Sequence, residues 1–239
     1  MVLSRLTCAI ATMLIASASA SADVIFTDGT FNPANYSQTA SVGPIVGSQC
    51  ATCGNPGDGL QFVLTLAGSG AADLGFVNNT FSYDPLTQGA ITSISASADK
   101  NLSSTIPNIV GFGNTFRPMI EQDGKFYLAA IVGPSLNTGS KGGSTGFNTI
   151  SQSGLVAADF SQFNFSTDTF SSGTPNFAGD SMLFGLGQIF GVNTGGANVE
   201  TAAYDNLKLD IATVPEPSTL WLVGSLLPVL AAIRVARRR

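Results

Sequence analysis

The sequence predicts an all-β body folded as an antiparallel β-sandwich, with an N-terminal signal helix before it and a C-terminal transmembrane helix after it. Short segments that alternate apolar and polar residues are separated by turn residues, and this pattern is typical of strands. No long helical pattern occurs between Asp23 and Thr213. The apolar runs at the two ends of the chain have the composition of targeting segments instead.

Residues 1–22 have the features of a secretory signal peptide. Arg5 comes before an apolar stretch, and small residues follow that stretch up to Ala22. Because signal peptidase cuts after small residues, we expect cleavage between Ala22 and Asp23. The Sec export machinery would then deliver the body out of the cytoplasm.

Residues 23–212 are predicted to form one β-sandwich domain, since this length suits a single domain and the sequence contains no internal repeat. Asp123-Gly124 is a hairpin signal before one of the expected strands. The segment 134–146 is low in complexity and is predicted to be a surface loop. The expected strands are 60–66, 91–98, 125–132, 154–157, 160–165, 182–186 and 204–211.

Two of these strands show which side chains should point inward. In the segment 91–98 apolar residues alternate with serines, which predicts one buried face and one polar face. In the segment 204–211 the pattern places Leu207, Leu209 and Ile211 in the core and turns Lys208 and Asp210 to water.

Residues 213–239 form a stalk, an apolar run and a basic end. The run 220–233 has no charged side chain and is a marginal length for a bilayer-spanning helix. The basic residues Arg234, Arg237, Arg238 and Arg239 follow it and predict a cytoplasmic C-terminus with an exported body. The sequence therefore predicts a membrane-anchored precursor.

The order of parts in this segment resembles the PEP-CTERM sorting signal of Gram-negative bacteria that make exopolysaccharide. The tripeptide is Pro215-Glu216-Pro217, and the hydrophobic run and arginine cluster come after it. The resemblance implies that an exosortase, a membrane-embedded transpeptidase-like enzyme, recognises the tripeptide and removes the anchor. It also implies a mature protein at the cell surface or in the extracellular matrix.

Charge excludes one class of partner for the body. From Asp23 to Pro217 there are 15 acidic and five basic residues, which gives a net charge of about −10. Because binding to phosphate backbones needs a basic surface, nucleic acid is not expected as a partner. The abundance of hydroxyl and amide side chains is compatible with hydrated polysaccharide.

Cys50 and Cys53 are the two cysteines of the exported body, in the sequence CATC. In an oxidising compartment a disulfide between them is the expected state. The loop it would close is very short, so its contribution to stability should be small. Redox activity and free thiols are the alternatives to this structural role, but the turn-forming residues that follow do not suit a redox CxxC motif.

The sequence has no histidine, which rules out a Ser-His-Asp or Cys-His mechanism and imidazole ligands for zinc. We expect no cofactor and no enzymatic activity. A structural calcium ion stays open, with Asn55, Asp58, Asp205 and Asn206 as candidate ligands, although turn formation explains the same residues.

A glycoside hydrolase is the remote alternative, because it needs only two carboxylates. Glu121 and Asp123 are the one close pair, and they resemble part of the Glu-x-Asp-x-x-Glu strand motif of retaining glucanases. Phe126 occupies the position of that motif's third glutamate. We therefore interpret Glu121 and Asp123 as part of a solvated turn.

Dispersed landmarks of the body resemble concanavalin A-like and laminin G-type jelly rolls, and galactose-binding-like jelly rolls share some of them. These landmarks are 54–57, 158–160, 182–186 and 204–207. The main interpretation is a structural or adhesive protein of exopolysaccharide or biofilm. The alternative is a lectin-like carbohydrate-binding module.

Overall fold

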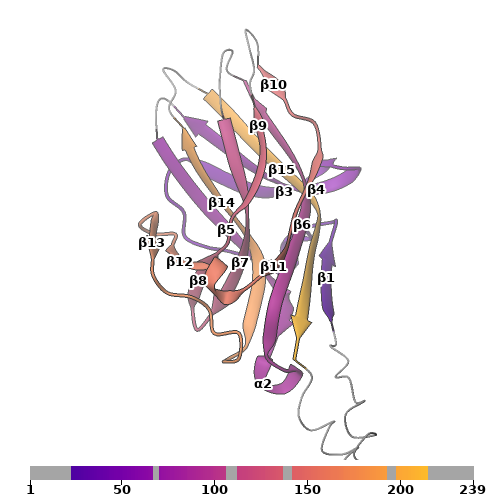
Figure 1. The fold of residues 1–239 in the computed structure, drawn as a ribbon. Coiled ribbons are helices and arrows are strands. Elements are labelled where there is room, and N and C mark those ends of the chain that lie inside the picture. The colour runs from indigo at the N-terminus through magenta and orange to yellow at the C-terminus, as the bar shows by residue number, and fades with distance from the viewer. Residues whose placement is uncertain (1–22, 67–69, 106–111, 137–141, 193–197, 215–239) are drawn as a thin grey trace, which may run out of the picture.

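In the computed structural model, two curled antiparallel sheets pack face to face, as the sequence predicts for a β-sandwich and consistent with a jelly roll (Figure 1). The structure describes residues 23–66, 70–105, 112–136, 142–192 and 198–214. The predicted signal helix and transmembrane helix lie outside these residues. Within the described ranges no helix is long and apolar enough to cross a membrane.

Sheet A has the strand order β10-β6-β15-β4-β3, with β1 added alongside β15 and β11 alongside β6. Its strands are antiparallel throughout, and the long strand β15 pairs with β4, β6 and β1. The strands are β1 (Val24–Asp28), β3 (Ile45–Gly54), β4 (Gly57–Leu66), β6 (Ile91–Ser104), β10 (Gly143–Ser144), β11 (Asn148–Leu155) and β15 (Asn198–Thr213).

Sheet B has the order β13-β12-β8-β7-β14-β5-β2, and β9 pairs with β7. Three short helical elements, η1 (Pro33–Asn35), α2 (Pro85–Gln88) and η2 (Ala157–Asp159), complete the described residues. The strands are β2 (Tyr36–Gln38), β5 (Gly70–Tyr83), β7 (Phe112–Gln122), β8 (Lys125–Leu128), β9 (Ile131–Leu136), β12 (Ser161–Asn164), β13 (Thr169–Ser171) and β14 (Met182–Val192).

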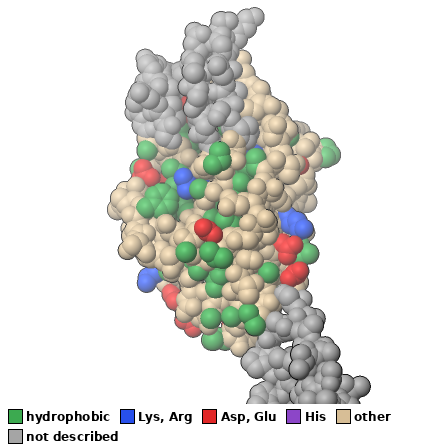
Figure 2. All heavy atoms as spheres, in the orientation of Figure 1, with side chains coloured by type: hydrophobic (Ala, Val, Ile, Leu, Met, Phe, Trp, Pro, Cys, Tyr) green, Lys and Arg blue, Asp and Glu red, His purple; other side chains and the backbone are tan. Residues whose placement is uncertain are grey.

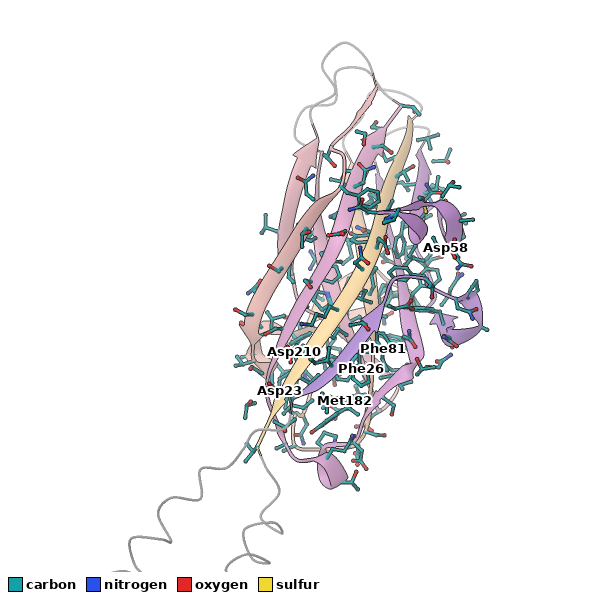
Figure 3. All side chains as sticks on the ribbon, turned by 90° about the vertical axis from the view of Figure 1, so that its right-hand side faces the viewer. Asp23, Phe26, Asp58, Phe81, Met182 and Asp210 are labelled. Carbon is teal, nitrogen blue, oxygen red and sulfur yellow. The ribbon has the colours of Figure 1, made fainter. Side chains whose placement is uncertain are left out.

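The core between the sheets is rich in phenylalanine. Phe62 of β4 meets Phe76 of β5 edge to face, with ring centroids 5.4 Å apart. At the opposite end of the core Phe26 of β1 stacks on Phe81 at 5.0 Å, and Figure 3 shows both rings together near Met182. Such ring pairs add to the free energy gained by burying their area.

Both predicted inward patterns are confirmed. Leu207, Leu209 and Ile211 are buried, while Lys208 is exposed on the other face. In β6 buried residues also alternate with partly exposed ones, so Ser93, Ser95 and Ser97 lie on the outer face of sheet A.

Two predictions of strand position were wrong in part. The segment 154–157 is a strand only in its first half, because β11 ends at Leu155 and η2 begins at Ala157. The segment 125–132 is divided into β8 and β9, which pair with successive parts of β7. The segment 134–146 is not wholly a loop, since β9 continues to Leu136 and β10 occupies Gly143–Ser144.

The two ends of the body lie side by side. Val24 pairs with Ile211, and the amide of Val214 donates to Ala90 O at 2.8 Å. Figure 3 places Asp23 and Asp210 at the same end of sheet A. Whatever precedes Asp23 and follows Val214 is therefore attached at one end of the sandwich.

Candidate functional site

A polar groove of about 440 Å³ lies on the outer face of sheet A. It runs over β11, β6 and β15, with β6 in the middle. The residues that line it are Ser95, Ala96, Ser97, Ser151, Gln152, Ser153, Lys208 and Asp210.

The register of the three strands explains the shape of the groove. Ser97 of β6 pairs with Ser151 on one side and with Lys208 on the other. Small serines on the middle strand form a low floor, while the longer Lys208 and Asp210 side chains form one wall. The opposite side is shaped by a bulge in β11, where the register shifts between Gln152 and Leu155. Gly154 adopts φ +72° in this bulge, a backbone conformation that favours glycine.

The groove is lined by hydroxyl, amide and charged groups and contains no aromatic ring. Lys208 Nζ lies 3.8 Å from Asp210 Oδ2, and both side chains are partly exposed. An exposed pair of this kind contributes little to stability, so both groups can exchange this contact for a ligand at small cost.

A network of side chains continues the polar surface beyond the groove along β6. Asp99 accepts hydrogen bonds from the hydroxyl of Thr149, from Asn206 Nδ2 at 2.9 Å and from Asn55 Nδ2 at 3.3 Å. Partial burial raises the pKa of Asp99, but these hydrogen bonds outweigh it and hold that pKa below its usual range. Asp99 is therefore a fixed negative charge at the end of the groove.

A bulge in β15 brings the predicted calcium candidates Asn55, Asp205 and Asn206 together. The register of β15 against β6 shifts between Asp205 and Lys208, and Asn206 adopts φ 50°. Asp205 is buried and accepts from the amides of Asn55 and Asn206. Asp58 lies apart from this network and accepts from Gln49 Nε2 at 3.4 Å.

The structure brings these candidates into a hydrogen-bonded network, and a bound calcium ion stays a prediction. The carboxylate oxygens of Asp99 and Asp205 already accept hydrogen bonds from protein donors, so the network is satisfied without a cation. The described part of the chain contains no group of three or more acidic or cysteine side chains placed to hold a metal ion.

Cys50 and Cys53 lie at the end of β3, and both are free thiols in this structure. Cys53 Sγ donates to Cys50 O at 3.5 Å. Burial raises the pKa of Cys53 to about 12, with further contributions from Cys50 and Asp205. The disulfide between the two stays a prediction.

Asp123 lies in a solvated turn, as the sequence predicts, but Glu121 lies in the preceding strand. Asp123 and Gly124 form the turn between β7 and β8 with φ 54° and φ 68°, and Asp123 is exposed. Glu121 lies on β7 in sheet B, on the other side of the molecule from the groove.

The outer face of sheet B is covered by its own chain. Phe163 and Phe165, in and after β12, pack with Val77, Met119 and Leu128 into a second hydrophobic cluster outside the main core. Phe165 reaches Gly75 of β5, where an added Cβ would lie 2.8 Å from its ring. This cluster covers part of the outer face of sheet B, while the outer face of sheet A carries the open polar groove.

The sequence predicted part of this site. The alternation in 91–98 predicted the serine face of β6, and that in 204–211 placed Lys208 and Asp210 outside. The contributions of Asp99 and of β11 were missed. The polar alternation of Thr149, Ser151 and Ser153 is a signal that could have found β11.

The sorting residues Pro215, Glu216 and Pro217 and the arginines 234 and 237–239 lie outside the described residues, as does Ala22. Asp23, the expected first residue after cleavage, is exposed immediately before β1. The predicted cleavage and sorting sites remain predictions.

No protein-family model matches this chain, and no curated protein matches it. Solved structures with a similar arrangement include the family 11 carbohydrate-binding module from Clostridium thermocellum in complex with a β-1,3-1,4-mixed-linked tetrasaccharide. That match has 19% identity and a TM-score of 0.43, and it covers 83% of this chain and 100% of the module.

Two further matches have lower identity. A mannan-recognising carbohydrate-binding module, TmCBM27, has 14% identity and a TM-score of 0.32 over 80% of this chain and 99% of the module. The lectin UEA-II in complex with galactose has 10% identity and a TM-score of 0.37 over 80% of this chain and 99% of the lectin. All three TM-scores are below 0.5, so these matches do not identify a ligand of this chain.

Proposed function

We propose that this protein is an exported, non-catalytic polysaccharide-binding protein of the cell surface or extracellular matrix. The observation that carries the proposal is the open groove on sheet A, lined by serine hydroxyls, an amide and one opposite-charge pair. Sugar hydroxyls both donate and accept hydrogen bonds, and this lining supplies both kinds of partner.

The lining also favours a particular class of glycan. Asp99 and Asp210 place negative charge along the groove, and the body carries a net charge of about −10. Like charges brought together across an interface lower affinity, so the groove favours a neutral or amine-bearing polymer over a polyuronate. Figure 2 shows no basic patch on the face that it presents, since the Lys and Arg side chains lie apart from one another and acidic side chains lie next to the one at the right-hand edge.

The absence of aromatic rings from the groove implies weak binding of each sugar unit. A hydrogen bond contributes only about 0.5–1.5 kcal/mol net, because the free groups bind water. A polymer with many repeats offers many equivalent sites, and several copies of the protein on one surface bind it together. Such multivalent binding suits an adhesive protein. The structural or adhesive interpretation and the carbohydrate-binding interpretation are therefore compatible.

Geometry at the groove supports a function without catalysis. Asp210 of β15 pairs with Ser95 of β6. Asp99 lies four residues after Ser95, which corresponds to about 13 Å along the strand. Glycosidase carboxylates lie roughly 5 to 10 Å apart. This pair is too far apart to act on one glycosidic bond.

Export and sorting belong to the same proposal. The Sec machinery and signal peptidase would release the body at Asp23, and an exosortase-type enzyme would act at Pro215-Glu216-Pro217. The side-by-side ends of the body support an anchored precursor, because the sandwich would extend from the membrane by one end.

A glycan array tests the proposed function. The full chain, purified in detergent, should bind a subset of neutral or amine-bearing polysaccharides selectively and saturably. The same preparation incubated with those glycans should release no reducing sugar. Array binding that is absent for every such polymer, or binding accompanied by hydrolysis, would overturn the proposal.

A further inference from the structure

Arg117 lies on the outer face of sheet B, away from the groove on sheet A. It is opposite Gly187 of β14 in the sheet register. Its guanidinium Cζ lies 5.4 Å from the ring centroid of Phe170 in β13. Phe170 is 50% exposed and packs at 4.7 Å against the buried Phe163. Figure 1 shows β12 and β13 on the same side of the molecule as β7 and β8.

Arg117 has no acceptor in the part of the chain that the structure describes. Its Nε atom is buried and makes no hydrogen bond. The ion pair found among the described residues is Lys208–Asp210, so no described carboxylate lies within 4.0 Å of the guanidinium. Burial lowers the pKa of Arg117, but arginine keeps its charge at neutral pH.

An unpaired, partly buried cation is unexpected in so acidic a body. Burying a donor without an acceptor destabilises the fold, and native structures contain few such groups. Among the described residues no carboxylate is placed to pair with Arg117. Its donors are therefore available to an acceptor that these residues do not supply.

We propose that Arg117 and Phe170 form a second binding site, whose ligand is a sugar unit that carries a carboxylate. The planar guanidinium matches a carboxylate through two parallel hydrogen bonds. Phe170 holds the guanidinium by a cation–π contact and presents exposed apolar surface beside it. A sugar acid supplies a carboxylate next to C–H groups, which is the pattern that this pair recognises.

The overall charge of the body restricts the polymer further. A net charge of about −10 repels a chain of uronates over distances up to the Debye length, about 8 Å at physiological salt. The site therefore suits occasional acidic units in a mostly neutral polymer. Because this site and the groove lie on opposite sheets, one molecule would hold two polymer chains.

Titration calorimetry with methyl galacturonoside, a single sugar unit with one carboxylate, tests this site, with its methyl ester as the matched neutral control. The full chain should bind the acid saturably, and the ester should bind at least tenfold more weakly. Arg117→Gln should weaken binding of the acid tenfold or more. Arg117→Lys should recover only part of it, because an ammonium group lacks the two-pronged geometry. Ser95→Ala/Ser97→Ala in the groove should leave the binding of methyl galacturonoside unchanged, which separates this site from the proposed function.

Thermal unfolding of Arg117→Gln provides a second readout. Arg117→Gln removes a partly buried cation without a hydrogen-bonded acceptor and also removes its cation–π contact with Phe170. These two changes oppose each other, so the Tm should change by no more than about 4 °C. A larger drop in Tm would indicate a structural partner and would overturn the proposal. Equal binding of the acid and the ester, equal binding by Arg117→Gln, or no saturable binding by the natural chain would each overturn it too.

Discussion

At the residue scale, Asp73 is a buried carboxyl group whose ionisation links stability to pH. It is fully buried on β5, and its Oδ1 accepts from the amide of Val42 at 3.0 Å. Its Oδ2 has no hydrogen-bond donor among the described residues. Burial and, to a smaller extent, the carboxyl of Asp168 raise the pKa of Asp73 to about 7, against the lowering effect of the hydrogen bond from the Val42 amide.

This environment predicts that stability falls as pH rises toward neutral. The unfolded pKa of Asp73 is near 4, so between about pH 4 and pH 7 the folded state binds the proton that the unfolded state has lost. The stabilisation is complete below pH 4 and is lost as pH rises through 7. Urea unfolding should show that Asp73→Asn, which stays neutral, gains stability relative to the natural chain between pH 4.5 and 8, on the order of 3 kcal/mol.

The comparison with Asp73→Asn isolates this group from Lys100. Burial lowers the pKa of Lys100 to about 7, so its ionisation changes stability in the opposite direction above neutral pH. Lys100 is present in both proteins and cancels in the difference. Parallel pH profiles for the two proteins would show that Asp73 is ionised in the folded state throughout.

At the scale of elements, the β12–β13 hairpin is seated on glycines of sheet B. A Cβ at Gly75 would lie 2.8 Å from Phe165 Cζ and 2.9 Å from both Met119 Sδ and Thr39 Cγ2. These contacts come from different elements, so no single side-chain movement relieves them. Phe165 covers the sheet because the strand beneath it has no side chain at this position.

Gly75→Ala should therefore lower the free energy of unfolding by about 1–3 kcal/mol through overpacking. Gly29→Ala is the matched control, since its closest contact would be 3.3 Å from Asn206 Oδ1. Chemical denaturation of both variants measures the difference. A loss as large in Gly29→Ala as in Gly75→Ala would contradict the packing of Phe165 described here.

The same scale shows why some elements could be predicted and others could not. In β6 and in the second half of β15, the alternation of side chains agrees with burial, because one face meets the core and the other meets water. In β5 the alternation of side chains does not agree with burial, because Asp73 and Val77 on its outer face are buried under the β12–β13 hairpin. A strand covered on both faces loses its period-2 signal.

The bulge in β15 could not be predicted for a related reason. Tyr204 and Leu207 both point into the core although they are an odd number of residues apart, because the register shifts between Asp205 and Lys208. Asn206 in a left-handed conformation makes this shift. The residues 204–207 have the sequence pattern of a strand start. The bulge becomes visible only from the register of β15 against β6.

At the scale of the whole molecule, the proposed sorting pathway predicts where the protein accumulates. Pro215→Ala/Pro217→Ala should leave the full-length chain in the inner membrane, because the processing enzyme would no longer recognise the tripeptide. Pro44→Ala/Pro174→Ala, in the body, is the matched control and should mature normally. Cell fractionation and C-terminal mass spectrometry distinguish the two, and normal maturation of the first variant would rule out this pathway.

The central claim is that the serine-lined groove of sheet A binds polysaccharide, and an affinity comparison tests it most directly. The titrated polymer is the neutral polysaccharide that the full chain binds best. Ser95→Ala/Ser97→Ala removes two hydroxyls from the groove floor, and Ser82→Ala/Ser171→Ala removes two exposed hydroxyls from sheet B. At about 0.5–1.5 kcal/mol for each hydrogen bond, the groove variant should bind about tenfold more weakly while the control binds like the natural chain. Equal affinities for all three proteins would contradict the claim.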